Sequence, residues 1–348
     1  MQFEQWDRLR PIGLTPAVMQ ALAALDASGD PMRVIEVRRD SVIVTDGESD
    51  FAARLLPAVR RDLPPLAVGD WVAAGRDAHR ELWVHDRMPP INELTRRDSE
   101  CRLQPLVSNV DTALLVMGLD GDFNLRRLER YLAMVTPAGL WPVVVLTKAD
   151  LAGDVDGRRD EVSRRIGAQI DVHTVNALDP SSAATLVPYL GRGHTLVLLG
   201  SSGAGKSTLT NALIGRAVQD TGAARADDSR GRHTTTARSL HRLPGGACVI
   251  DTPGLRGLAP DIDEAGLAAS FEDIQSLSAQ CRFRDCTHAD EPGCAVRMGV
   301  APDRLANYQK MLRDIRRDAL TPLQRREVVS MWKARHRATA VRMKMKRS

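Results

Sequence analysis

Three hydrophobic patterns follow one another along the 348 residues of the chain. Residues 1–30 form a leader in which the apolar positions of AVMQALAALDA recur at helical spacing. Five short β-rich runs then alternate with Gly, Asp and Pro turn signals up to about residue 88. The runs are MRVIEVRR, SVIVTDG, FAARLL, DWVAAG and ELWVHDR. They predict a small, OB-like β-barrel over residues 31–100.

From residue 105 the pattern changes to continuous apolar runs, which are typical of strands buried on both faces of a parallel sheet. Amphipathic segments such as NLRRLERYLAMV lie between most of these runs. The alternation predicts an α/β domain over residues 105–260, followed by a helical domain over 261–348. The predicted strands are DTALLVMGL (111–119), PVVVLT (142–147), QIDVHTV (169–175), HTLVLLG (194–200) and CVID (248–251).

A phosphate-binding loop is predicted where the fourth of these strands ends. The pattern G-x-x-x-x-G-K-[ST] is matched by GSSGAGKS, and a helix-compatible run follows it. Its glycines let backbone N–H groups converge on phosphate oxygens, which the positive end of the helix dipole also attracts. Lys206 would reach the β- and γ-phosphates, and Ser207 would bind Mg²⁺; a chance Gly/Ser loop is the alternative. The residues expected to contact nucleotide are Gly200, Ser201, Ser202, Gly203, Ala204, Gly205, Lys206, Ser207 and Thr208.

Two further motifs, TKAD and DTPG, follow buried strands and suit a guanine nucleotide. Asp150 can accept hydrogen bonds from the ring N–H and the exocyclic amine of guanine, a pattern that adenine does not offer. Asp251 could hold Mg²⁺ through water, and Gly254 could donate its N–H to the γ-phosphate. A chance match and an ordinary strand-end turn are the respective alternatives. The guanine motif comprises Thr147, Lys148, Ala149 and Asp150, of which Lys148 can lay its stem along the base.

Three of the five cysteines and one histidine cluster in CRFRDCTHADEPGC. The spacing is Cys281-x4-Cys286-x-His288-x5-Cys294. Three thiolates and an imidazole form a closed tetrahedral set that suits a structural Zn²⁺ and leaves no position for water. Such a metal would fix a loop that has little core of its own. Buried free thiols or partial disulfides are the alternative.

The order of the motifs is unusual, because TKAD precedes the phosphate-binding loop instead of following it. A nucleotide site lies outside the carboxyl ends of a parallel sheet, so each loop can reach it whatever the order of the strands in the chain. The sequence therefore predicts a circular permutation. TKAD, GSSGAGKST, GRHTTT, DTPG and the Cys/His cluster together resemble the circularly permuted GTPases of the RsgA (YjeQ) family, over nearly the whole chain. The resemblance implies a multidomain protein with an OB-like barrel, a circularly permuted α/β P-loop GTPase domain and a C-terminal α-helical zinc-binding domain.

Two positions depart from the common GTPase pattern. Thr147 stands where many GTPases have Asn, and we expect it to cost a hydrogen bond that helps hold the site. Asn176 and Ala177 replace the Ser-Ala that is frequent in the third base-contacting loop.

The segment RGRHTTTARS (230–239) is predicted to be switch I. By resemblance to other GTPases, Thr235 is expected to close over Mg²⁺ and the γ-phosphate, with Thr234 as the alternative. Leu255 follows DTPG where Ras-like GTPases use a Gln to orient the attacking water, so we expect slow intrinsic hydrolysis. His233 is the candidate to position that water or accept its proton, and a histidine satisfied on a polar loop is the alternative. The expected catalytic residues are therefore Lys206, His233 and Thr235.

Charge adds a candidate binding segment. The net charge of +4 alone says little, but basic residues recur from 325 to 347, where Glu327 is the only acid. This pattern indicates nucleic-acid binding, with a solvated helix and tail as the alternative. We find no secretory signal and no run near the roughly 18 apolar residues of a membrane span. We expect a cytoplasmic monomer without membrane contact, in which clustered cysteines favour metal over disulfides.

The motifs alone thus predict a permuted GTPase with a zinc module and a basic tail. The resemblance implies a role late in maturation of the small (30S) ribosomal subunit, with GTP, GDP, the subunit and its rRNA as partners. GTP would be hydrolysed to GDP and phosphate, faster on the subunit, with Mg²⁺ and one structural Zn²⁺ as cofactors. Two alternatives remain: an RNA-binding assembly factor with GTP as a structural ligand, and a P-loop phosphotransferase.

Overall fold

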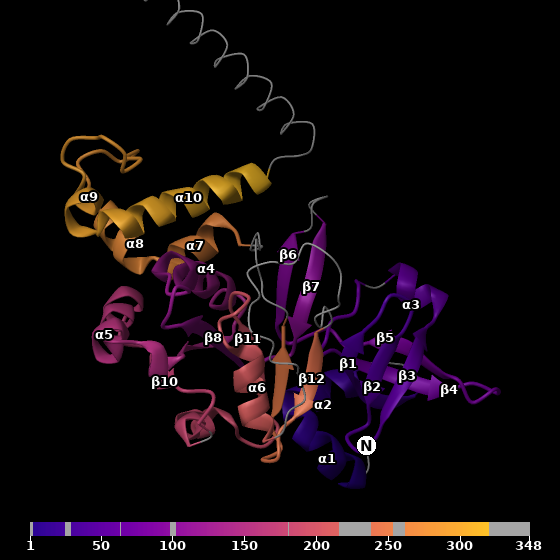
Figure 1. Cartoon of the computed structure of the whole chain (residues 1–348). Coiled ribbons are helices and arrows are strands. Elements are labelled where there is room, and N and C mark those ends of the chain that lie inside the picture. The colour runs from indigo at the N-terminus through magenta and orange to yellow at the C-terminus, as the bar shows by residue number, and fades with distance from the viewer. Residues whose placement is uncertain are drawn as a thin grey trace, which may run out of the picture. The chain divides into compact units, whose positions relative to one another are not determined.

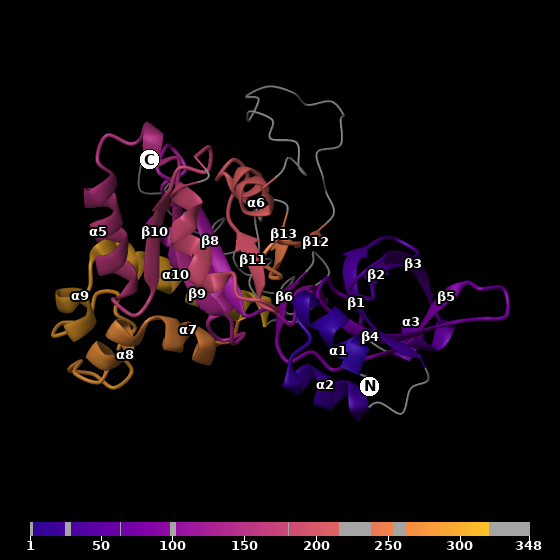
Figure 2. The ribbon, with the colours of Figure 1, turned by 90° about the horizontal axis from the view of Figure 1, so that it is seen from below.

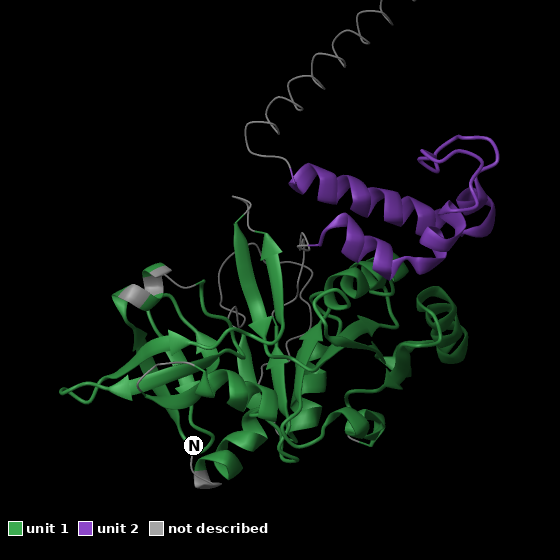
Figure 3. Cartoon of the chain, turned by 180° about the vertical axis from the view of Figure 1, so that it is seen from behind, with its two compact units in different colours: residues 1–260 green, residues 261–348 purple. Residues whose placement is uncertain are grey.

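The computed structural model describes residues 3–24, 29–62, 64–97, 102–179, 181–215, 238–252 and 262–319 (Figure 1). The chain divides into two compact units, residues 1–260 and 261–348 (Figure 3). Within the described ranges, no helix combines the length and the apolar character needed to cross a membrane.

The leader folds into α1 (Phe3–Leu9), the 3-10 helix η1 (Arg10–Ile12) and α2 (Pro16–Ala23). Thr15 caps α2, because its side chain accepts a hydrogen bond from the backbone N–H of Val18. Leu9, Ile12 and Leu14 are fully or almost fully buried in the same core as the α/β sheet. These helices therefore belong to the packed interior of the first unit.

Five strands form the expected small barrel: β1 (Asp30–Val37), β2 (Val42–Thr45), β3 (Asp50–Leu55), β4 (Trp71–Arg76) and β5 (Leu82–Arg87). Their order is β1-β2-β3-β5-β4, and an additional β1–β4 pairing closes the barrel. Alternating apolar residues fill its interior, among them Val34, Val44 and Val84. A short helix, α3 (Pro57–Asp62), lies between β3 and β4.

A separate two-stranded sheet follows the barrel, formed by β6 (Glu93–Arg97) and β7 (Leu103–Ser108). The strands are antiparallel (Figure 1). No element was predicted here from the sequence, because ELTRR and LQPLVS are short, show no regular alternation of apolar and polar residues, and the second contains a proline.

The α/β sheet has the order β10-β9-β8-β11-β13-β12, and all its pairs are parallel except β12–β13. Along β8 successive side chains face opposite sides: Leu115 packs in one core with α4 and α5, and Leu114 in another with α6. The strands are β8 (Thr112–Gly118), β9 (Trp141–Thr147), β10 (Asp171–Val175), β11 (Thr195–Leu199), β12 (Ser239–Arg242) and β13 (Cys248–Asp251). The helices are α4 (Leu125–Val135), η2 (Ala149–Leu151), α5 (Val155–Ile166), η3 (Ser182–Tyr189) and α6 (Lys206–Ile214).

The barrel and the α/β sheet are joined by a strand pair. β12 pairs with β13 on one side and with β1 of the barrel on the other, where Ser239 lies opposite Glu36. Eleven strands thus form one continuous hydrogen-bonded sheet (Figure 2).

The second unit is helical where it is described, as predicted. Its helices are α7 (Glu264–Ser270), α8 (Glu272–Ser278), α9 (Ala295–Gly299) and α10 (Pro302–Asp318). Phe271 is fully buried and its ring packs 5.3 Å from that of Tyr308 on α10, centroid to centroid. The Cys/His loop lies between α8 and α9.

Candidate functional site

Three predicted motifs reach the same edge of the sheet. β9, β11 and β13 run parallel, so Thr147, Gly200 and Asp251 all come at or just after the carboxyl ends of their strands. A site at this edge does not depend on the order in which the chain visits the strands. The sheet thus accommodates the permuted order of the motifs.

The phosphate-binding loop connects β11 to α6. Gly203 and Gly205 have φ values of +84° and +91°, a conformation that favours glycine. A Cβ atom at Gly200 would lie 2.4 Å from the carbonyl oxygen of Val116, so only glycine fits there. The loop therefore closes tightly and ends where α6 begins, as an anion-binding loop requires. Ser201 and Ala204 are buried, Ser202 is exposed, and Ser207 and Thr208 are half-buried in the first turn of α6.

Lys206 folds back over the loop. Its side chain donates hydrogen bonds to the carbonyl oxygens of Gly200, at 3.0 Å, and Ser201, at 2.7 Å. The residue is only 6% exposed, and burial lowers the pKa of its ammonium, although nearby Asp251 favours the charged form. A buried ammonium hydrogen-bonded to neutral carbonyl oxygens is well placed to exchange them for phosphate oxygens.

Asp251 and Ser207 form the part of the site that suits Mg²⁺. Asp251 is 5% exposed, and burial raises the pKa of its carboxyl group to about 6. Lys206 and hydrogen bonds from Ser207 and the Thr252 backbone act in the opposite direction. A desolvated carboxylate beside a hydroxyl offers the hard oxygen ligands that Mg²⁺ prefers. The residues present therefore fit the ion.

Thr147 links the guanine motif to the phosphate-binding loop. Its hydroxyl is buried and donates a hydrogen bond of 2.5 Å to the carbonyl oxygen of Ala204. The Thr147 hydroxyl thus makes a hydrogen bond that helps hold the site, and the expectation that threonine costs a bond relative to asparagine stays a prediction. Gly205 leaves room for this approach: a Cβ atom at that position would be in tight contact with the Thr147 hydroxyl oxygen, at 3.2 Å.

The other guanine-motif residues lie at the end of β9. Lys148 has a left-handed backbone with φ of +58°, and Ala149 and Asp150 begin η2. Asp150 is exposed at this edge. In the third loop, the Asn176 side chain accepts a hydrogen bond from the backbone N–H of Leu178, so it stabilises its own turn.

Two aspartates that the sequence analysis did not single out contact both motifs. Asp120 accepts a hydrogen bond of 2.6 Å from the Lys148 ammonium. Asp122 accepts one of 2.5 Å from the hydroxyl of Ser201 in the phosphate-binding loop. Their signal was the polar segment LDGDFN directly after a buried strand, which is the position of site loops in a parallel sheet.

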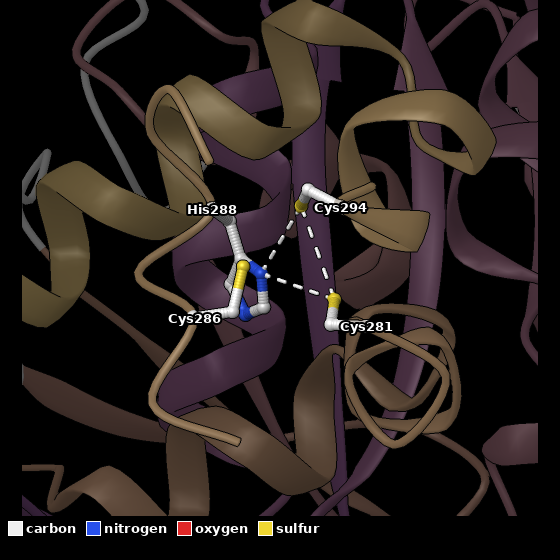
Figure 4. Close-up of side chains that lie close together, drawn as sticks. All are labelled: Cys281, Cys286, His288 and Cys294. Carbon is white, nitrogen blue, oxygen red and sulfur yellow. Dashed lines mark hydrogen bonds between the residues drawn. The ribbon is translucent and has the colours of Figure 1, made fainter. Parts of the chain in front are cut away.

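In the second unit, Cys281, Cys286, His288 and Cys294 converge as predicted (Figure 4). Their four candidate ligand atoms all lie within 4.8 Å of one another. The Nδ1 atom of His288 is 3.7 Å from Cys281 Sγ and 3.5 Å from Cys294 Sγ, while its Nε2 lies 3.0 Å from the Ser278 hydroxyl. Sulfur atoms 3.9 Å apart, as in Cys281 and Cys294, suit two corners of a tetrahedron with metal–sulfur bonds of about 2.3 Å. The donor set fits zinc.

Several predicted residues lie outside the described part of the chain. They are His233, Thr234, Thr235, Gly254, Leu255 and the basic residues after 319. Their proposed roles rest on the sequence alone.

A parallel sheet that presents a GKS loop, TKAD and a buried DT pair at one edge, with TKAD first in the chain, defines a circularly permuted P-loop GTPase. The family model described as RsgA GTPase matches residues 87–260. The chain belongs to the RsgA GTPase family.

Relatives and solved structures agree with this assignment. The chain is 44% identical over 309 residues to a Xanthomonas axonopodis pv. citri protein named small ribosomal subunit biogenesis GTPase RsgA, covering 86% of this chain and 84% of that protein. A protein of the same name from Xanthomonas campestris pv. campestris is 45% identical over 302 residues, covering 84% and 82%. The crystal structure of YjeQ from Thermotoga maritima is 26% identical with a TM-score of 0.61, covering 82% of this chain and 98% of that one. The crystal structure of YloQ, described as a circularly permuted GTPase, is 26% identical with a TM-score of 0.57, and the match covers 84% of this chain and 97% of that one.

Proposed function

We propose that this GTPase acts in late maturation of the small ribosomal subunit, binding the subunit and its rRNA and hydrolysing GTP to GDP and phosphate faster when bound. The supporting observation is a guanine motif hydrogen-bonded to a phosphate-binding loop, in a chain that is 44% identical over most of its length to a protein named for this process. The protein would act as a monomer in the cytoplasm.

Hydrolysis would depend on residues at the carboxyl edge of the sheet. Gly200 to Thr208 would hold the phosphates, Lys206 would neutralise them, and Asp150 would select guanine. Ser207 and Asp251 would hold Mg²⁺, which supplies positive charge to the phosphate oxygens. Gly254 would donate to the γ-phosphate.

The switch residues complete this proposal. Thr235, or alternatively Thr234, would close over Mg²⁺ once GTP is bound. His233 would orient the attacking water, because Leu255 has no polar group to do so. Unchanged subunit-stimulated turnover in His233→Ala would exclude that role for the histidine.

The second unit would bind one structural zinc through Cys281, Cys286, His288 and Cys294. A closed set of four protein ligands leaves no site for a reacting water, so the metal would stabilise this loop. The basic residues after Arg325 would add salt-dependent contacts to rRNA phosphates.

GTP turnover measured with and without purified small subunits, at one salt concentration, tests the proposal. We expect strong stimulation by small subunits, little by large subunits, and none in Lys206→Ala. Flat turnover in a protein that still binds GTP would favour an RNA-binding assembly factor with GTP as a structural ligand, which Leu255 makes chemically reasonable. A phosphorylated small-molecule product would instead indicate a phosphotransferase.

A further inference from the structure

The loop after β8, residues 119–124, lies between the two nucleotide motifs. β8 is hydrogen-bonded to β9 on one side and to β11 on the other. The guanine motif follows β9, and the phosphate-binding loop follows β11. Because all three strands are parallel, the loop after β8 emerges between the two motifs at the carboxyl edge of the sheet.

Asp122 binds the phosphate-binding loop from this position. One carboxylate oxygen accepts hydrogen bonds from the Ser201 hydroxyl, at 2.5 Å, and from Arg127, at 2.6 Å. The other accepts from the backbone N–H of Gly118 at 3.3 Å. The side chain is 15% exposed, so these bonds form largely out of water. Arg127 fixes the carboxylate, and the carboxylate fixes Ser201.

Asp120 binds the guanine motif from the same loop. One of its carboxylate oxygens lies 2.6 Å from the Lys148 ammonium, and the other accepts a hydrogen bond of 3.0 Å from the backbone N–H of Asp122. The two aspartates are thus connected to each other as well as to the two motifs. The rest of the loop is held by Arg158, which lies over the Phe123 ring at 4.8 Å and donates to the Leu119 carbonyl oxygen.

We propose that Asp120 and Asp122 are positioning residues of the nucleotide site, and that their loop makes the geometry of the guanine motif and the phosphate-binding loop interdependent. Neither aspartate would touch the nucleotide. Asp122 would act through Ser201, and Asp120 through Lys148. The inference rests on the proposed assignment of these motifs as the nucleotide site.

The two contacts have distinct physical effects. The carbonyl oxygen of Ser201 accepts a hydrogen bond from Lys206. The Asp122–Ser201 bond therefore also fixes one of the acceptors that hold the lysine ammonium. Lys148 has a long flexible side chain, and the ion pair with Asp120 restricts it to one side of the site before nucleotide arrives. Binding then loses less side-chain entropy, which raises affinity.

Double-mutant cycles on GDP affinity test the proposal in the full chain. Asp120→Ala and Asp122→Ala are each expected to raise the GDP Kd about tenfold, as loss of a hydrogen bond to a charged group does. In a Lys148→Ala background, Asp120→Ala should change the GDP Kd little further. In a Ser201→Ala background, Asp122→Ala should likewise change it little further. Asp156→Ala, at an 83% exposed position on α5, is the matched control and should bind GDP normally. Unfolding by urea, measured on each variant, identifies losses that come from instability.

Additive effects in both cycles, or single variants that fold and bind GDP within about twofold of the wild type, would overturn the inference. If Asp122→Ala does not fold, Ser201→Ala removes only the hydroxyl and must by itself weaken GDP binding about tenfold. A wrong assignment of the nucleotide site would give a different result. The wild type would then not bind GDP, or the wild type and Lys206→Ala would bind GDP with the same affinity.

Discussion

The hydroxyl of Thr147 and the carbonyl oxygen of Ala204 form a 2.5 Å hydrogen bond, although the residues are 57 positions apart in the chain. One belongs to the guanine motif and the other to the phosphate-binding loop. The bond is buried and joins the last residue of β9 to the loop that follows β11. The two halves of the site therefore keep their mutual position in a chain that visits them in the permuted order.

Thr147→Val is expected to weaken nucleotide binding. The substitution keeps the shape of the side chain, removes the donor, and leaves the Ala204 carbonyl oxygen buried without this partner. Such a loss costs about 1–3 kcal/mol, so the GDP Kd should rise about 5- to 150-fold. A loop that relaxes after the substitution would give a value in the lower half of that range. Calorimetric titration with GDP measures it. Thr147→Ser, which retains the hydroxyl, is the control. Equal GDP Kd values for Thr147→Val and Thr147→Ser would show that the hydrogen bond contributes nothing to nucleotide affinity.

The fold was predictable where hydrophobic period and turn chemistry agreed. The five barrel strands, the buried strands and α6 appeared close to their expected positions, because each has a simple period and clear boundaries. β6 and β7 were missed, since ELTRR and LQPLVS are short and their apolar residues show no regular alternation. β12 was not delimited for a similar reason: SLHR is short, and its partner β1 is distant in the sequence.

The candidate site shows the same division. Lys206, Asp150 and the four metal-ligating residues could be named from motif spacing, because the chemistry fixes both residue type and interval. Asp120 and Asp122 could not, since an aspartate in a Gly-containing loop usually serves a turn. Only the order of strands in the sheet places their loop between the two motifs.

Asp251 should make the nucleotide-free protein less stable as pH rises. Burial raises the pKa of this carboxyl group from 3.8 to about 6 in the folded protein, so the folded state binds more protons than the unfolded state between these values. Stability is therefore greatest below about pH 4 for this group and falls as pH increases to about 6, by at most about 3 kcal/mol. Urea unfolding of the wild type and Asp251→Asn, at pH 5 and pH 7.5 without nucleotide, measures the difference.

At pH 7.5 the Asp251→Asn variant should have a higher free energy of unfolding than the wild type. At pH 5 this difference in stability should be smaller. The amide cannot ionise, so it avoids the cost of a buried charge. The same substitution should abolish the Mg²⁺ dependence of GDP binding, because it removes the negative charge that the ion would pair with. A pH-independent difference in stability would mean that the carboxyl group titrates near its ordinary pKa.

Ser278 should tune metal binding without being a ligand. Its hydroxyl lies 3.0 Å from His288 Nε2, which leaves Nδ1 facing the sulfur atoms of Cys281 and Cys294. Removing such a partner of a ligating histidine weakens metal affinity about 10- to 100-fold. Competition with a chromogenic chelator should show this weaker zinc affinity for Ser278→Ala. Cys286→Ser, which lacks one ligand, should no longer bind one zinc ion per protein molecule. Cys248→Ala, which removes a buried thiol of the first unit, should retain it. Equal zinc affinity in Ser278→Ala and the wild type would contradict the assigned orientation of His288.

Arg33 should be a main determinant of how firmly the barrel is attached to the rest of the first unit. Its guanidinium is completely buried, and desolvation lowers its pKa. It donates to Gly69 O at 3.2 Å, to Thr195 Oγ1 at 2.8 Å and to Asn109 O at 2.8 Å, and also to the Ile12 carbonyl oxygen. These partners belong to the leader, the barrel, the segment before β8 and the start of β11.

Arg33→Lys should therefore lower the free energy of unfolding by about 3 kcal/mol. An ammonium cannot replace a planar group that donates to four acceptors, so several of these acceptors would be left unpaired. Arg33→Met should cost a similar amount, because it relieves the buried charge but satisfies none of the oxygens. Urea unfolding followed by Trp fluorescence is a direct measurement, as Trp71 packs beside Arg33. Arg54→Lys, at a 62% exposed barrel position, should change stability by less than about 0.5 kcal/mol. An Arg33→Met variant as stable as the wild type would show that these acceptors find other donors and that the barrel is held mainly by the β1–β12 pairing.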